Sequence, residues 1–273
     1  MASPYDLIAI STVQSWLGQS GDAAVVGQLV TQVSRAILSL LGRPILLPNL
    51  YRETANGDGR RSLILRNWPV SSVASLLIDG QAIPASPALS LGQSTQAGYV
   101  LEPGDPAPPG RPQALLLRDA WFRRGVQNVV TTYTAGYQVS GETATVPTSL
   151  PTLSAQAPYG AWASDCGVAY ANGVALTAVA SAPGAGQYCV SAGLYSFSPA
   201  DAGAAVALTY GYVPSDIAEA ALEWICDRYA YKGHIGQKSK SLGGQETVSY
   251  DLSAVPPFVA AILQPYRRIA LPC

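Results

Sequence analysis

Charged residues are nearly absent from one continuous stretch of this chain. From residue 143 to 213 the only charged side chains are Asp165 and Asp201, and all sixteen lysines and arginines lie outside this stretch. Its residues are mainly Ala, Gly, Ser, Thr, Val and Tyr, interrupted by prolines. So abrupt a change of composition indicates a separate structural unit. We therefore predict that a β-rich module, 143–205, is inserted into a host of different composition.

The host begins and ends with helical patterns. Asp22 is a good N-cap for a long helix whose apolar residues recur at the 3.6-residue period, and Gly42 ends it. A short helix precedes it, with Ser11 as the expected N-cap. Two more helices are predicted over 214–233 and 257–265, each with a proline in its first turn.

Between residues 51 and 137 the apolar period changes to two, which is typical of strands. Asp79-Gly80 predicts a type I′ hairpin turn, and the proline-rich segment 104–112 predicts a loop. The expected fold is therefore α+β: a small helical bundle with a β-hairpin region, plus an inserted small β module. Its core would be formed by 1–142 and 206–273.

The charge balance excludes some functions. Charged residues make up 12% of the chain and the net charge is −1, whereas a protein that mainly grips nucleic acid usually has a clear basic excess. So few charges predict a surface covered by other copies or other proteins. We find no apolar run of about 18 residues and no secretory signal. We therefore expect that the chain does not span a membrane and that it is made and assembled in a cytoplasm.

The segment 232–251, KGHIGQKSKSLGGQETVSYD, carries the only histidine, His234. Its glycines lack the spacing of a phosphate-binding loop and it follows a predicted helix rather than a strand. No G-x-S-x-G elbow accompanies His234, so a capping or surface role is favoured over catalysis. The acids of the preceding helix, Asp216, Glu219 and others, most simply form its solvated face. What remains is a long polar loop, either functional or simply solvated.

The four cysteines indicate neither a metal site nor a redox motif. They form no C-x-x-C pair and none lies near a histidine, so no cofactor or metal is expected. A Cys166–Cys189 bridge is compatible with one small sheet, but free thiols are favoured for a cytoplasmic protein.

Several segments, in order, resemble one family. They are AILSLLGRPIL, YRETANGDGRRSLILRNWPVSSVASLLIDG, VVTTYTAGY, VPSDIAEAALEWICDRYAYKGHIGQKSKSLGGQETVSYD and VPPFVAAILQPYRR. Together they resemble the head–tail connector (adaptor) proteins of long-tailed double-stranded DNA bacteriophages and of gene-transfer agents. The resemblance covers roughly residues 5–137 and 206–268 and rests on the order of the segments.

The resemblance implies a non-enzymatic structural virion protein at the head–tail junction. Such proteins form a homo-oligomeric ring, commonly of about twelve copies, between the portal protein and a stopper or tail-completion protein. The ring extends the channel for passing double-stranded DNA, without sequence specificity. Carried onto this chain, an inter-subunit or channel loop would include Lys232, His234, Lys238, Lys240 and Glu246. A portal-docking tail would include Tyr266, Arg267, Arg268, Ile269 and Leu271.

Some alternatives stay open. Lys238 and Lys240 would be either weak channel contacts or partners of acids such as Asp227 and Glu246 in a neighbour. The inserted module, with strands expected at 186–191, 193–197 and 204–210, resembles a β module of phage structural proteins. It would contact the head or tail, or contact nothing. Another neck component, such as a stopper or tail terminator, is the main alternative function; a hydrolase or a DNA-binding module has less support.

Overall fold

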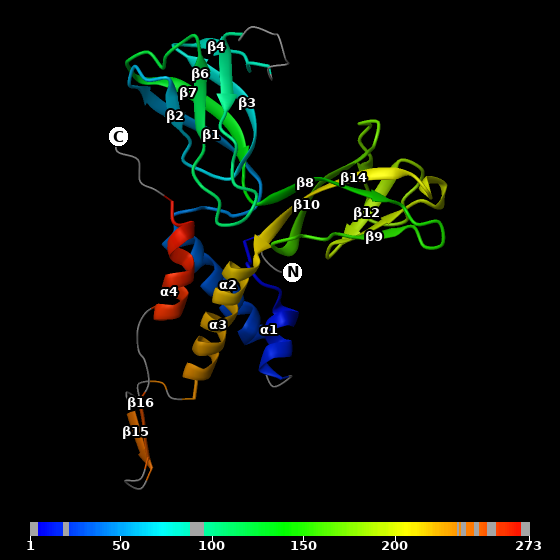
Figure 1. Cartoon of the computed structure of the whole chain (residues 1–273). Coiled ribbons are helices and arrows are strands. Elements are labelled where there is room, and N and C mark those ends of the chain that lie inside the picture. The colour runs from blue at the N-terminus through cyan, green and yellow to red at the C-terminus, as the bar shows by residue number, and fades with distance from the viewer. Residues whose placement is uncertain are drawn as a thin grey trace. The chain divides into compact units, whose positions relative to one another are not determined.

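The fold is α+β, as predicted, and the chain divides into two compact units (Figure 1). One unit is formed by residues 1–44 and 213–267, and the other by 45–212 and 268–273. Helices from the two ends of the chain therefore form one unit. The computed structural model describes residues 5–18, 22–87, 96–233, 235, 239–242, 246–249 and 255–268.

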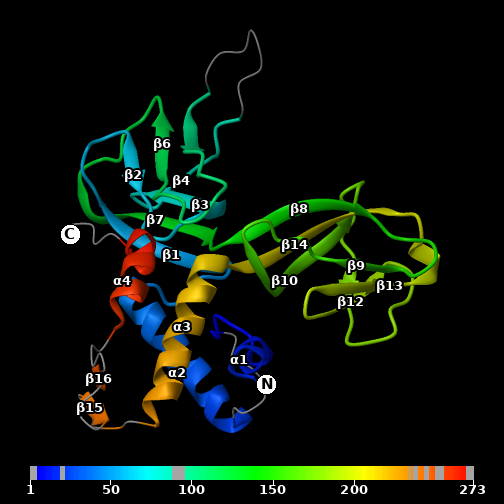
Figure 2. The same cartoon turned by 60° about the horizontal axis from the view of Figure 1, so that its bottom comes forward.

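The first unit is a helical bundle with one β-hairpin. Its helices α2 and α3 lie side by side (Figure 2), and α1 and α4 pack against them. The hairpin is formed by two short antiparallel strands between α3 and α4. The elements are α1 (Ile10–Leu17), α2 (Ala23–Leu41), α3 (Ser215–Tyr231), β15 (Ser239–Leu242), β16 (Glu246–Ser249), α4 (Pro257–Leu263) and a 3₁₀ turn (Gln264–Tyr266).

Helix α2 begins and ends as its sequence predicts. The Asp22 carboxylate accepts a hydrogen bond from the Ala24 N–H at 2.9 Å, and Gly42 ends the helix with φ of 64°. Length and composition alone would let α2 cross a membrane, but its apolar stripe is buried in the bundle. The predicted cap of α1 is wrong: Ala9 is the N-cap and Ser11 lies inside the helix. There the Ser11 carbonyl accepts the Ser15 hydroxyl at 2.9 Å.

The first part of the second unit consists of two small sheets around one core. Strand order is β1-β7-β3-β4 in one sheet and β2-β6-β5 in the other, and all neighbours are antiparallel. Asp79 and Gly80, with φ of 51° and 79°, form the predicted type I′ turn between β3 and β4. The strands are β1 (Asn49–Gly57), β2 (Ser62–Ile64), β3 (Val70–Ile78), β4 (Gln81–Ile83), β5 (Gly98–Leu101), β6 (Ala114–Arg118) and β7 (Gly125–Ala135).

The remainder of the second unit is the β-rich module, which has its own core of tyrosines and aliphatic residues. Strand order is β10-β14-β8 in one sheet and β11-β12-β13-β9 in the other. The three strands expected here are present as β12, β13 and β14. The bounds are β8 (Gln138–Thr145), β9 (Thr152–Ser154), β10 (Gly160–Tyr170), β11 (Thr177–Ala178), β12 (Gln187–Ser191), β13 (Leu194–Phe197) and β14 (Ala205–Pro214).

Candidate assembly surfaces

The predicted assembly loop contains a β-hairpin rather than only irregular chain. Lys232 is exposed just after α3, Lys240 lies on β15 and Glu246 lies on β16. His234 and Lys238 fall outside the described residues. The segment was expected to be a loop because it is polar and rich in glycine. However, SKSL and ETVS flank the three residues Gly-Gly-Gln, and a short glycine-containing connection of this length is a hairpin signal.

This hairpin has no third strand in the described part of the chain. Residues of β15 and β16 pair in register, Ser239 with Ser249 and Leu242 with Glu246, and with no other described strand. An isolated two-stranded hairpin is at best marginally stable in water. Both strands are also edges, whose outward N–H and C=O groups can pair with another chain.

The predicted docking tail starts in contact with the helical unit. Tyr266 is 1% exposed, and its hydroxyl donates to the two Asp216 carboxylate oxygens at 2.5 and 2.7 Å. The Arg267 Nε donates to the Leu40 carbonyl at 3.2 Å. These contacts hold the first tail residues within the subunit. Ile269 and Leu271 fall outside the described residues.

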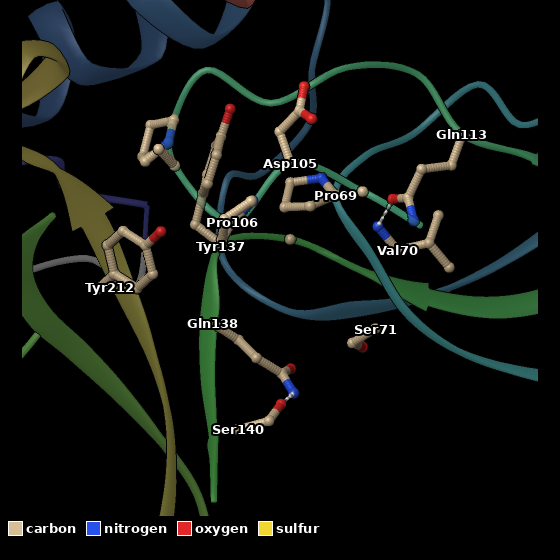
Figure 3. A pocket seen from close by; sticks show the side chains of 14 residues that line it. Pro69, Val70, Ser71, Asp105, Pro106, Gln113, Tyr137, Gln138, Ser140 and Tyr212 are labelled. Carbon is tan, nitrogen blue, oxygen red and sulfur yellow. Dashed lines mark hydrogen bonds between the residues drawn. The ribbon is translucent and has the colours of Figure 1, made fainter. Parts of the chain in front are cut away.

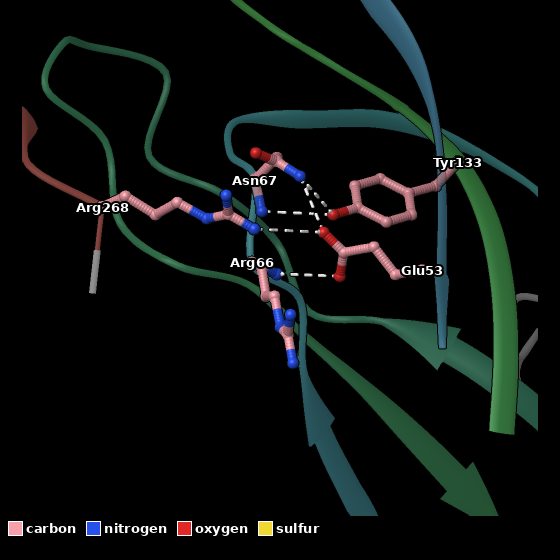
Figure 4. A network of polar contacts seen from close by, with 5 residues as sticks. All are labelled: Glu53, Arg66, Asn67, Tyr133 and Arg268. Carbon is pink, nitrogen blue, oxygen red and sulfur yellow. Dashed lines mark hydrogen bonds and ion pairs between the residues drawn. The ribbon is translucent and has the colours of Figure 1, made fainter. Parts of the chain in front are cut away.

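Arg268 joins a polar network in the second unit (Figure 4). Its Nη2 lies 3.8 Å from the Oε1 of Glu53, which also accepts the Asn67 side-chain amide at 2.7 Å. The Arg66 N–H donates to the other Glu53 oxygen at 3.3 Å, and Asn67 donates to the Tyr133 hydroxyl at 3.1 Å. Burial, followed by Glu53, raises the pKa of Tyr133 above its ordinary value. The network fixes Arg268 at a half-buried acid.

The two acids of the uncharged stretch are held by tyrosines. Asp165 accepts the hydroxyls of Tyr188 at 2.6 Å and Tyr195 at 3.0 Å. Asp201, 8% exposed, accepts the Tyr170 hydroxyl at 2.7 Å and the Gly186 N–H at 3.1 Å. The module therefore stabilises its carboxylates with hydroxyl and N–H donors in the absence of any lysine or arginine.

Glu142, on β8 next to the uncharged stretch, follows the same rule. Glu142 accepts the Tyr210 hydroxyl and, at 3.3 Å, the Gln156 N–H. Burial raises the pKa of Tyr188, Tyr195 and Tyr210, with further contributions from their carboxylate neighbours. These tyrosines therefore stay protonated donors across the neutral range. The sequence shows the uncharged stretch, but not which tyrosines meet its acids.

The second unit also has a cavity of about 240 Å³ (Figure 3). Its wall includes the rings of Tyr137 and Tyr212, whose centroids are 6.0 Å apart, and prolines of the loop after β5. The Gln113 side chain crosses one side, accepting the Val70 N–H at 2.6 Å. Its only acid, Asp105, lies 3.6 Å from Arg111. The lining has neither a nucleophile paired with a base nor a pair of acids, so it offers no catalytic constellation.

The described cysteines are free thiols. Cys166 is exposed, whereas Cys189 and Cys226 are partly buried. Burial raises the pKa of the partly buried Cys226 thiol. Within the described residues, no group of three histidine, cysteine, aspartate or glutamate side chains could hold a metal ion.

No protein-family model and no curated protein matches the chain. Solved structures similar to it are neck proteins of gene-transfer agent (GTA) particles. "Neck of native GTA particle computed with C12 symmetry" matches at 14% identity and TM-score 0.41, covering 99% of this chain and 94% of the other. "Neck of empty GTA particle computed with C6 symmetry" matches at 13% and 0.34, with the same coverage.

Proposed function

We propose that this chain is a non-enzymatic structural protein of the neck of a virus-like particle. Copies form a closed ring, of about twelve subunits, between the portal and a stopper or tail-completion protein. The ring extends the channel through which double-stranded DNA passes. The order of the sequence segments shared with the connector family supports this role, and the β15–β16 hairpin is the structural observation that carries it.

The hairpin supports assembly because it is incomplete alone. Each strand offers unpaired backbone groups along one edge, and a neighbouring subunit supplies the missing partner by strand addition or by packing. The predicted loop residues Lys240 and Glu246 lie on its two strands. In our proposal they face a neighbour, as do the adjacent Lys232, His234 and Lys238. A contact between two different surfaces of the subunit repeats head to tail, and it closes a ring when the rotation between neighbours divides a full turn evenly.

Several exposed apolar side chains are candidates for contact with a neighbouring subunit. Val126 is 83% exposed, Trp16 69% and Ile235 68%, in a chain with few charges to keep such groups in water. Apolar residues scattered singly over a surface are ordinary and do not by themselves indicate an interface. Others at least 40% exposed are Tyr5, Leu50, Ile64, Leu116, Trp121, Leu150, Val174, Leu194 and Phe258.

The tail and the inserted module take separate roles in this proposal. Residues 265–273 dock to the portal, with Tyr266, Arg267 and Arg268 fixing the start of the segment to the subunit. The module, 143–205, contacts the head or tail. Its charges are satisfied internally, so it would bind by backbone and apolar contacts rather than by ion pairs.

The hairpin gives the sharpest test. In one variant a short Gly-Ser linker replaces residues 239–249. In a matched control the same linker replaces the exposed turn 181–184, which lies on the module. Sedimentation velocity is run in the condition in which the parent forms rings, either alone or with portal rings added. It should give ring-sized particles for the parent and the control and an unassembled hairpin variant, with all three equally helical by circular dichroism. Rings from a folded hairpin variant would overturn the assembly role of the hairpin.

A further inference from the structure

Two loops of the second unit meet at one end of its first pair of sheets. One joins β1 to β2 and the other joins β6 to β7. The Gly59 N–H donates to the Phe122 carbonyl, and the Phe122 N–H donates to the Arg60 carbonyl, both at 2.8 Å. Phe122 is itself 0% exposed. The loops are thus tied together by backbone hydrogen bonds and anchored in the core.

The side chain of Asn128, on β7, also holds this pair of loops together. Its Oδ1 accepts the Gly57 N–H at 2.9 Å, and its Nδ2 donates to the Arg123 carbonyl at 2.9 Å. Only glycine fits at 57, because a Cβ there would lie 1.8 Å from that carbonyl oxygen. The conformation is therefore built into the fold, and a ligand need not order it.

These loops carry four exposed arginines, two from each: Arg60, Arg61, Arg123 and Arg124. We call them, together with Trp121, the arginine tip. Against them stand three exposed acids. Asp58, which pairs with Arg60 at 3.3 Å, and Asp119 belong to the same loops, and Asp79 accepts a hydrogen bond from the Asn128 Nδ2 at 3.0 Å. The arginine tip thus has a local excess of positive charge, although the whole chain has a net charge of −1.

Trp121 adds an aromatic surface. Its side chain is 55% exposed, and the Arg61 guanidinium lies 5.2 Å from the centroid of its ring. Guanidinium groups bind phosphate in a bidentate way, and an exposed indole offers a face on which a base can stack. Positive charge combined with an aromatic platform is the pattern of a nucleic-acid contact rather than of a simple ion pair.

We propose that the arginine tip binds the phosphate backbone of a nucleic acid, independently of sequence. A second copy of the chain offers a competing anionic surface, the exposed acidic row of α3. Its members are Glu219, Glu223 and Asp227. The carboxylates of such a row would pair with the arginines but offer no aromatic group to stack on the exposed tryptophan. Nucleic acid uses both. This site is independent of the proposed ring, because one subunit supplies all of its residues.

Salt dependence tests the proposal with a fluorescein-labelled 30-base-pair DNA duplex and a single strand of equal length. Because Arg60 is paired with Asp58, three arginine–phosphate contacts are expected. They predict that log K falls against log salt with a slope of about −2.7 for the duplex and of about −2.1 for the single strand. Removing two arginine charges should reduce the duplex slope by about two and the affinity at 0.1 M salt by roughly 50-fold.

The test pair is Arg123→Gln/Arg124→Gln against Arg35→Gln/Arg52→Gln, where both control arginines are exposed and lie outside the tip. Both double variants change the net charge equally. Equal weakening by the two, or no salt-dependent binding by the parent chain, would overturn the proposal. A third overturning result is unchanged DNA binding with loss of ring mass in the tip variant, which would assign the tip to a second copy. The mass of the particles tests ring formation and the salt-dependent affinity tests nucleic-acid binding. Either proposal can therefore be refuted without the other.

Trp121→Leu gives a second readout. It keeps every charge, so the duplex slope should stay unchanged, while affinity for the single strand falls by roughly 10-fold as one stacked base is lost. An unchanged single-strand affinity would remove the tryptophan from the site.

Discussion

Replacing Asp165 with asparagine should loosen the β-rich module while the rest of the chain stays intact. The carboxylate accepts hydrogen bonds from Tyr188 and Tyr195, which are 2% and 0% exposed. The Trp162 Nε1 in turn donates to the Tyr195 hydroxyl at 3.1 Å. The perturbation therefore acts on a connected set of buried hydroxyls rather than on one surface acid.

The magnitude follows from those two bonds. Hydrogen bonds to a charged group contribute about 1.5–3 kcal/mol each. Because Asp165 is half-buried, water can partly replace its carboxylate as hydrogen-bond acceptor in a variant. Asp165→Ala should therefore lower the free energy of unfolding of the module by about 3 kcal/mol. Asp165→Asn keeps one carbonyl acceptor without the charge, and it should cost about half as much.

Native-state hydrogen exchange resolves the effect, because peptides from β12 and β13 report on the module alone. Asp119→Asn is the matched control: this aspartate is exposed and should change stability by no more than about 0.5 kcal/mol. Protection in β12 and β13 should fall for the Asp165 variants only. If Asp165→Asn and Asp119→Asn behave alike, the tyrosine–carboxylate account of the module is wrong.

Three further predictions concern other parts of the chain. Burial raises the pKa of Tyr188 and Tyr210 in the folded protein, so their contribution to stability is complete below about pH 10 and falls above it. Above about pH 10, each tyrosine should make the free energy of unfolding, measured with urea, fall by about 1.4 kcal/mol per pH unit. Tyr188→Phe should reduce this slope, and a parent chain whose free energy of unfolding does not change with pH in this range would contradict the prediction. Gly57→Ala should destabilise the β1–β7 region by about 1–3 kcal/mol, because its Cβ would meet the Arg123 carbonyl oxygen; an unchanged melting temperature would show that the loops are not fixed. Asp22→Ala should cost about 1 kcal/mol through the lost cap of α2, which exchange of the first-turn amides would detect and which Asp22→Ser should restore.

Local signals in the sequence predicted the helices well. The cap, the apolar period and the final glycine of α2 all lie within one continuous segment, and so does the Asp79-Gly80 turn. The N-cap of α1 was missed because Ser11 has a capping side chain, whereas the N-cap lies two residues earlier, at Ala9. A cap is determined by backbone conformation as well as by residue type.

Long-range contacts were beyond the reach of these signals. A period of two marks strands but not their partners. The arginine pairs at 60–61 and 123–124 are brought together by the pairing of β1 with β7 and of β2 with β6. The same holds for Asp165 and Tyr188, which are separated by more than twenty residues. The β15–β16 hairpin was a different case, since its glycines and charges are as typical of a loop as of a turn.

The central claim is that this chain closes into a ring, and images of the purified full chain, together with its mass by light scattering, test it most directly. The account predicts closed rings of about twelve copies, formed either by the chain alone or on addition of portal rings. A chain that stays monomeric at all concentrations, and that leaves portal rings bare, would contradict it.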